Sequence, residues 1–161
     1  VIAVGKIFDI FDGEGVTEKI KTTGNTNGIA FTKALQTRDF EGLAFVNLVD
    51  FDMLYGHRRD VAGYAAAATE FDHFLADFIP GMRENDLLMV TADHGCDPSY
   101  AKTTDHTREY VPYLICGKGV KPGVDLGTKL CFGTIAHTIC DYLGVDASSL
   151  DGQSVLPEIL K

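Results

Sequence analysis

The stretch that decides the fold is LLMVTADHG, residues 87–95. Leu87–Ala92 is a largely apolar run of strand length, and it leads directly into Asp93, His94 and Gly95. A run of this kind predicts a strand that is buried in a sheet. Gly95 allows the backbone to turn sharply after the two polar side chains. The stretch therefore predicts an aspartate and a histidine at the carboxyl end of a strand, where ligands bind in open α/β sheets.

A second apolar run has the same arrangement. Leu43–Val49 is a predicted buried strand, and it is followed by Asp50, Asp52 and His57. The spacing between Asp52 and His57 is compatible with one loop that folds back on one ion. Periodicity does not choose between Asp50 and Asp52 as the ligand, and Asn47 is a further inward-facing alternative.

A third histidine follows in the long segment 95–108, which carries no pattern of secondary structure. Such segments in compact domains are usually functional, which makes His106 a candidate ligand, and Asp105 is placed to accept an imidazole N–H. Carboxylates and imidazoles together suit Mn, Zn or Fe, and five donors exceed the needs of one ordinary site. The pattern thus predicts a pair of metals, with His57, Asp93, His94, His106 and either Asp52 or Asp50 as ligands.

The remaining candidates have simpler interpretations. His73 and His137 fall within predicted helices and are interpreted as structural. Lys6 follows a strand and a glycine, but the Walker pattern is incomplete, so the residues alone favour an exposed lysine. Cys96 lies beside the candidate ligands, yet it fits a reduced, partly buried thiol better than a metal ligand.

Strands and helices alternate along the chain, which predicts an α/β fold with a largely parallel sheet covered by helices. Residues 12–26 are predicted as a loop, and Asp60 as the N-cap of the longest helix. No repeat or linker divides the sequence, so we predict a single domain over residues 1–161. The predicted strands are Val1–Val4, Leu43–Val49, Leu87–Ala92 and Val111–Cys116, and the predicted helices are Asn27–Gln36, Asp60–Ile79 and Phe132–Leu143.

Composition excludes several classes of function. The net charge is −9 without a basic block, which argues against a nucleic-acid or anionic-membrane surface. No apolar run is long enough to cross a bilayer, and no signal peptide is present. The four cysteines form no CxxC pair and are interpreted as reduced thiols, which predicts a cytoplasmic protein.

Three segments together carry a specific resemblance. They are VIAVGKIFDIFDGEGVT (1–17), VNLVDFDMLYGHRRD (46–60), and MVTADHGCDP (89–98) with TDHTREYVP (104–112). In combination they resemble the bacterial, metal-dependent phosphopentomutases of the alkaline phosphatase superfamily. TADHG alone indicates only the superfamily, and the other two segments narrow the resemblance to this family.

The resemblance implies an alkaline-phosphatase-like, three-layer fold and an isomerase that interconverts the 1- and 5-phosphates of ribose or 2-deoxyribose. It implies two Mn²⁺ ions, with other divalent metals as alternatives, and a sugar bisphosphate activator. One ion is then held by Asp52, His57 and His106, which selects Asp52 over Asp50. The other is held by Asp93, His94 and an aspartate from an upstream strand. Lys6 matches a lysine that contacts the substrate phosphate, in contrast to the interpretation from the residues alone.

In the resembled family, the threonine nucleophile, that aspartate and a cap domain all precede the matched part. We therefore expect the chain to be the C-terminal portion of the catalytic core. It would have no catalytic nucleophile of its own, and its partners would be a pentose phosphate and the missing N-terminal and cap segments. The alternatives are a cofactor-independent phosphoglycerate mutase, a metal-dependent phosphatase, and a metal-binding fragment that catalyses nothing.

Overall fold

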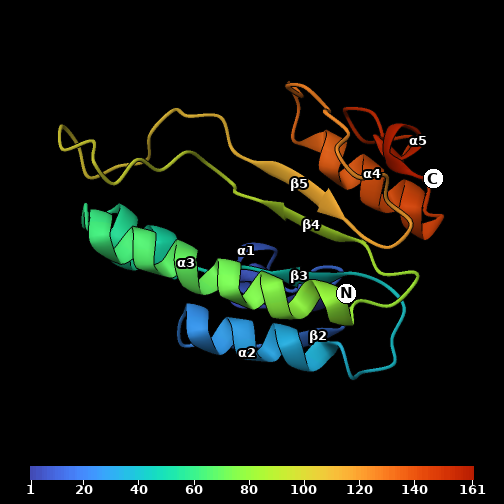
Figure 1. Cartoon of the computed structure of the whole chain (residues 1–161), viewed down its shortest axis with the longest axis horizontal. Coiled ribbons are helices and arrows are strands. Elements are labelled where there is room, and N and C mark those ends of the chain that lie inside the picture. Colours follow the sequence, from blue (N-terminus) through green and yellow to red (C-terminus); the bar gives the residue numbers. More distant parts are fainter. The chain divides into compact units, whose positions relative to one another are not determined.

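The computed structural model describes all of residues 1–161, in which short strands alternate with helices (Figure 1). The strands are β1 (Ile2–Val4), β2 (Glu18–Ile20), β3 (Ala44–Val46), β4 (Leu88–Thr91) and β5 (Tyr113–Cys116). The α-helices are α1 (Ile7–Ile10), α2 (Asn25–Leu35), α3 (Val61–Phe78), α4 (Gly133–Leu143) and α5 (Leu156–Ile159). A π-helix, η1 (Phe51–Gly56), precedes α3, and a 3₁₀ turn, η2 (Ile79–Gly81), follows it.

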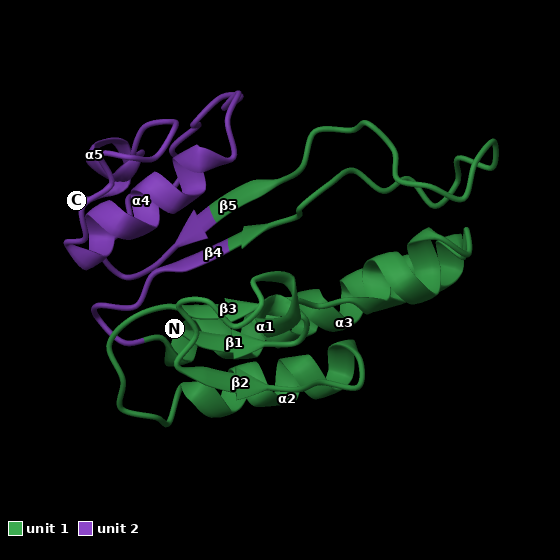
Figure 2. Cartoon of the chain, turned by 180° about the vertical axis from the view of Figure 1, so that it is seen from behind, with its two compact units in different colours: residues 1–82, 90–114 green, residues 83–89, 115–161 purple.

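The chain divides into two compact units, coloured separately in Figure 2. Unit 1 contains residues 1–82 and 90–114, and unit 2 contains residues 83–89 and 115–161. The boundary crosses both β4 and β5. All of the predicted site residues lie in unit 1. Because compact units also occur inside single domains, the expectation of one domain over residues 1–161 stays a prediction.

Unit 1 is built on a parallel sheet with the strand order β2-β1-β3. Its central strand β1 is buried along its whole length and pairs Val4 with Ile20 on one side and with Val46 on the other. Ile2, Val4 and Leu35 of α2 form the core cluster. Helices α2 and α3 lie side by side over one face of this sheet (Figure 1). The predicted α/β class with a parallel sheet is therefore confirmed.

Two details of the sheet differ from the sequence-based expectation. Strand β2 lies in the stretch 12–26 that was predicted as a loop, since a three-residue strand among glycines and threonines has no apolar signature. The predicted burial of the second apolar run is also wrong at Phe45, which is 41% exposed. The reason is that β3 is the edge strand of the sheet in this structure and has β1 as its only neighbour.

Strands β4 and β5 form a separate two-stranded sheet and run in opposite directions (Figure 1). The predicted strands are therefore divided between two sheets instead of one. Between β4 and β5 runs the predicted long loop, whose base is closed by an antiparallel bridge in which Thr107 N donates to Gly95 O at 3.1 Å. A Cβ on Gly95 would lie 2.8 Å from the carbonyl oxygen of Thr107, so the close approach of the two backbones requires glycine.

The start of α3 follows the sequence prediction, but the residues before it do not. Asp60 is the N-cap, and its Oδ1 accepts a hydrogen bond from Gly63 N at 2.9 Å, as predicted. The preceding segment forms η1, which no sequence pattern indicated. π-helical turns are rare and occur frequently at functional sites. This turn places Asp52 in its first turn and His57 directly after its last residue.

Unit 2 is organised around α4. Thr138 is fully buried, donates to Thr134 O at 2.7 Å and accepts from Val155 N at 3.1 Å, which ties the helix to the segment before α5. Gly144 ends α4 in the left-handed region with φ 68°, which a glycine adopts without strain. A bilayer-spanning segment would need a longer and more apolar helix than any in the structure.

Candidate metal centre

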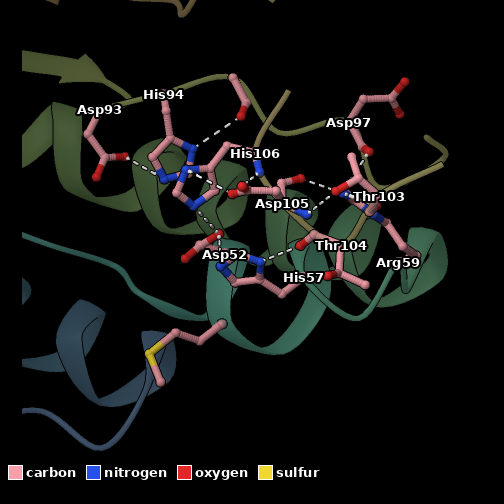
Figure 3. Close-up of polar contacts among 12 residues, drawn as sticks. Asp52, His57, Arg59, Asp93, His94, Asp97, Thr103, Thr104, Asp105 and His106 are labelled. Carbon is pink, nitrogen blue, oxygen red and sulfur yellow. Dashed lines mark hydrogen bonds and ion pairs between the residues drawn. The ribbon is translucent and has the colours of Figure 1, made fainter. Parts of the chain in front are cut away.

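The two aspartates that follow β3 point to different places. Asp50 Oδ2 accepts a hydrogen bond from Asn25 N at 2.6 Å, and Asp50 N donates to Asn25 Oδ1 at 2.9 Å. Asp50 therefore satisfies the first turn of α2. Asp52, two residues further into η1, faces the histidines instead (Figure 3). The structure thus places Asp52, and not Asp50, at the candidate site.

Histidines from two separate segments converge on one oxygen of Asp52. Asp52 Oδ1 lies 3.3 Å from His57 Nε2 and 3.4 Å from His106 Nε2. His94, at the end of β4, joins them because its ring stacks on that of His106 with 3.5 Å between centroids. Ligand atoms of Asp52, His94 and His106 all lie within 4.8 Å of one another, the spacing of donors around one ion.

Backbone carbonyls orient two of these imidazoles. His57 Nδ1 lies 2.5 Å from Thr104 O, and His94 Nδ1 lies 3.1 Å from Gly95 O. Because a carbonyl oxygen only accepts, each Nδ1 carries the proton and donates it. In the neutral ring, Nε2 then has a free lone pair. Metal-ligating histidines are held in this way, with the second ring nitrogen bonded to a carbonyl or carboxylate.

Asp52 provides the test of whether a cation fits. Its Oδ1 is buried and has no hydrogen-bond partner, although buried polar atoms are nearly always paired. The bare Nε2 of His57 faces this oxygen, so two acceptors oppose each other at 3.3 Å. A cation between them would satisfy both atoms. The oxygen and nitrogen donors present suit Mn²⁺, Zn²⁺ or Fe²⁺, and the residues therefore fit a divalent metal.

Asp93 and Lys6 lie at the margin of this cluster. Asp93 Oδ1 is 3.6 Å from His94 Nε2, but its side chain is 77% exposed and falls outside the group of Asp52, His94 and His106. His94 therefore lies with Asp52 and His106 in this structure, whereas the family resemblance pairs it with Asp93. Lys6 follows β1, and its Nζ lies 2.7 Å from Sδ of Met53, the neighbour of Asp52.

The other candidates are not at the centre of the site. His73 and His137 lie in α3 and α4, as predicted. Cys96 is partly buried, and burial raises the pKa of its thiol, with the charge of Asp52 as a further cause. A thiol with a raised pKa stays protonated at neutral pH, which suits a structural cysteine better than a metal ligand.

Sequence reasoning missed Arg59. Its guanidinium donates to the carbonyl oxygens of Asp97, Thr103 and Asp105 in the long loop (Figure 3). The only signal in the sequence was the position of Arg59 in the segment HRRD, directly after His57.

Comparison with known proteins agrees with this geometry. Residues 4–147 match the Metalloenzyme superfamily. The chain belongs to this superfamily. The match includes all of the predicted site residues, and the α/β fold with its parallel sheet is that of an alkaline-phosphatase-like member of the Metalloenzyme superfamily.

Several relatives of the chain share the name phosphopentomutase. The chain is 53% identical over 160 residues to the phosphopentomutase of Acetivibrio thermocellus and 52% identical over 161 residues to that of Lachnoclostridium phytofermentans. It is 50% identical to the phosphopentomutase of Symbiobacterium thermophilum. These matches cover 99–100% of the chain but only 40–41% of each relative. The chain therefore spans about two-fifths of the length of the curated relatives that it matches.

Proposed function

We propose that the protein acts as a phosphopentomutase, an isomerase that moves a phosphoryl group between the C1 and C5 oxygens of ribose or 2-deoxyribose. The observation that carries this proposal is the buried, unpaired Oδ1 of Asp52 with two imidazole Nε2 atoms facing it. It marks a divalent-metal site in a chain about 50% identical, over its whole length, to proteins named phosphopentomutase.

In this proposal Asp52, His57 and His106 hold one Mn²⁺ ion, and Asp93 and His94 contribute to a second. When bound, such ions neutralise negative charge on the attacking and leaving oxygens of a phosphoryl transfer. The carbonyls of Thr104 and Gly95 hold the rings of His57 and His94 in the tautomer that presents Nε2. The protein's own task is then positioning and electrostatics, which dominate catalysis of phosphoryl transfer.

Lys6 would bind the phosphate of the substrate. Its ammonium contacts Met53 of η1, the residue that follows Asp52 in the sequence, and the Lys6 side chain is exposed. A phosphate held there would be close to the metal ligands, and the local cation would offset part of the net charge of −9. The phosphorylated threonine and the remaining metal ligand, an aspartate, would come from sequence that the longer relatives have in addition to the matched part. A sugar bisphosphate would maintain the phosphorylated form.

The test combines metal analysis with an assay of turnover. The protein carrying these residues together with the relatives' further segments should convert ribose 5-phosphate to ribose 1-phosphate in the presence of Mn²⁺, followed by ³¹P NMR. Residues 1–161 alone should bind Mn²⁺ without turnover. A variant with His94→Ala is the control for the site, and His73→Ala, an exposed change on α3, is the control for the fold.

The same assay separates the alternatives. Release of inorganic phosphate without isomerisation would indicate a phosphatase, and interconversion of 2- and 3-phosphoglycerate would indicate the other mutase of the superfamily. Metal binding without turnover of any of these substrates, in the longer protein, would leave a metal-binding protein without catalysis. Turnover of ribose 5-phosphate by residues 1–161 alone would contradict the placement of the nucleophile outside them.

A further inference from the structure

The three residues before His106 are held by their backbone carbonyls. Arg59 donates to Thr103 O and Asp105 O, and His57 Nδ1 donates to Thr104 O between them. Three consecutive carbonyls thus bond to the short segment 57–59 (Figure 3). This clasp, defined as residues 57–59 with residues 103–105, ends at the residue that brings an imidazole to Asp52.

Arg59 makes most of the clasp. Its Nε and Nη2 donate to Thr103 O at 2.9 and 2.6 Å, Nη1 donates to Asp97 O at 3.0 Å, and Nη2 also donates to Asp105 O. Every one of these acceptors is a main-chain oxygen of the loop. A planar guanidinium presents its donors in a fixed fork, so these bonds fix the loop's orientation as well as its distance.

The backbone of Arg59 is itself unusual. It has φ 55°, in the left-handed region that costs a side-chain-bearing residue about 1 kcal/mol or more. Such a conformation persists where surrounding contacts determine it, and it frequently accompanies a function. Arg59 lies between the end of η1 at Gly56 and the N-cap of α3 at Asp60.

We infer that Arg59 is a positioning residue for the metal centre, which holds His106 within reach of Asp52 through the carbonyls of residues 97, 103 and 105. The inference rests on the proposed metal site but not on the identity of the substrate. His106 is 42% exposed and lies between two anchors of the loop, with the clasp on its N-terminal side and the Gly95–Thr107 bridge on its C-terminal side. The clasp couples His57 to His106, because residues 57–59 bond to the backbone of residues 103–105, which directly precede His106.

The arrangement of the three loop carbonyls around Arg59 requires an arginine at this position and not a lysine. A lysine ammonium carries the same charge but is a compact donor without the rigid fork, and it cannot reach carbonyls spread over residues 97–105 in one arrangement. If only the charge mattered, Arg59→Lys would preserve the metal affinity. If the fork matters, Arg59→Lys and Arg59→Ala would both reduce it.

The experiment measures Mn²⁺ affinity by isothermal titration in the wild-type protein and in Arg59→Lys, Arg59→Ala and Arg58→Ala. Loss of a group that orients a metal ligand costs about 10- to 100-fold in affinity, which is the expected result for both Arg59 variants. Arg58→Ala removes the same charge from the neighbouring exposed position and should leave the affinity unchanged. Circular dichroism of the metal-free proteins confirms that each variant is folded.

Two further readouts separate positioning of His106 from general support of the fold. In a His106→Ala background, Arg59→Ala should change the Mn²⁺ affinity by less than about twofold, because its effect passes through that ligand. The visible spectrum of the Co²⁺-loaded protein should change in Arg59→Lys as it does in His106→Ala. An undiminished effect of Arg59→Ala without His106 would overturn the inference, as would wild-type affinity in Arg59→Lys. Failure of the wild-type protein to bind Mn²⁺ would refute the proposed metal site itself and this inference with it.

Discussion

The three-stranded sheet and the long loop of unit 1 hold their residues in place by different means. The sheet is fixed by a ladder of backbone pairs around a buried apolar strand, in which Val4 has no exposed surface. The loop is fixed by polar side chains, chiefly Arg59, that bond to its carbonyls. Stability therefore resides in the first region, whereas the second carries His106 to the candidate site. Single substitutions should separate the two properties.

The largest effect on folding is expected from Val4→Asp. It places an unpaired charge in the core cluster, and we expect it to lower the free energy of unfolding by at least about 3 kcal/mol. Urea titration followed by far-UV circular dichroism measures this loss. Phe45→Asp, at the 41% exposed position of the edge strand, is the matched control and should cost much less. Equal losses at the two positions would contradict the division between core and edge.

The largest effect on the site is expected from His94→Ala. It removes a proposed ligand of the second ion, and we expect the Mn²⁺ affinity of that ion's site to fall by more than about 100-fold, because removing a ligand exceeds the effect of removing its support. The unfolding transition of the metal-free protein should stay where it is, since the residue follows β4 and is not part of the core. Near-normal affinity after this change would exclude His94 as a ligand.

Smaller effects are expected from Asp50 and Asp52, and they should fall on different properties: stability for Asp50 and metal affinity for Asp52. Asp50→Ala removes the acceptor at the start of α2 and should cost about 1 kcal/mol of stability with little effect on the metal affinity. Asp52→Ala should weaken Mn²⁺ binding with little loss of stability in the metal-free protein. Titration and thermal unfolding of both variants decide the assignment, and a loss of metal binding in Asp50→Ala alone would reverse it.

The smallest effect is expected from Cys96→Ala, which should leave the Mn²⁺ affinity unchanged. Burial raises the pKa of this thiol, so the reactive thiolate is scarce at neutral pH and its population grows only as the pH rises toward the raised value. Alkylation by iodoacetamide should therefore be slower than that of free cysteine at pH 7 and should accelerate at higher pH. Fast alkylation at pH 7, or weaker Mn²⁺ binding after the substitution, would indicate a role at the site.

The residues that the sequence could place are those whose environment follows from periodicity. The apolar runs predicted β1, β3, β4 and β5, and the capping preference of aspartate predicted the start of α3 at Asp60. Histidines directly after strands or in a long loop were also predictable, and the structure brings His57, His94 and His106 together. These features depend on local patterns and on the general position of ligands at strand ends.

The rest depends on contacts between residues far apart in the chain. No local pattern distinguishes Asp50 from Asp52, since their difference lies in which partner each meets across space. Asp50 precedes η1 and bonds to Asn25, whereas Asp52 lies in the first turn of η1 and faces His57 and His106. Arg59 was equally hidden, because an arginine that bonds to carbonyls more than thirty positions away has the same local sequence as an exposed one.

The clasp also has a consequence for the order of folding. Its bonds join residues that are 44 to 47 positions apart, and α3 and β4 lie between them in the chain. The entropic cost of closing so long a segment falls only when the intervening helix and strand have already shortened the distance. Contacts of high sequence separation form slowly for this reason. His106 should thus reach Asp52 among the last events of folding, on a scaffold that is already complete.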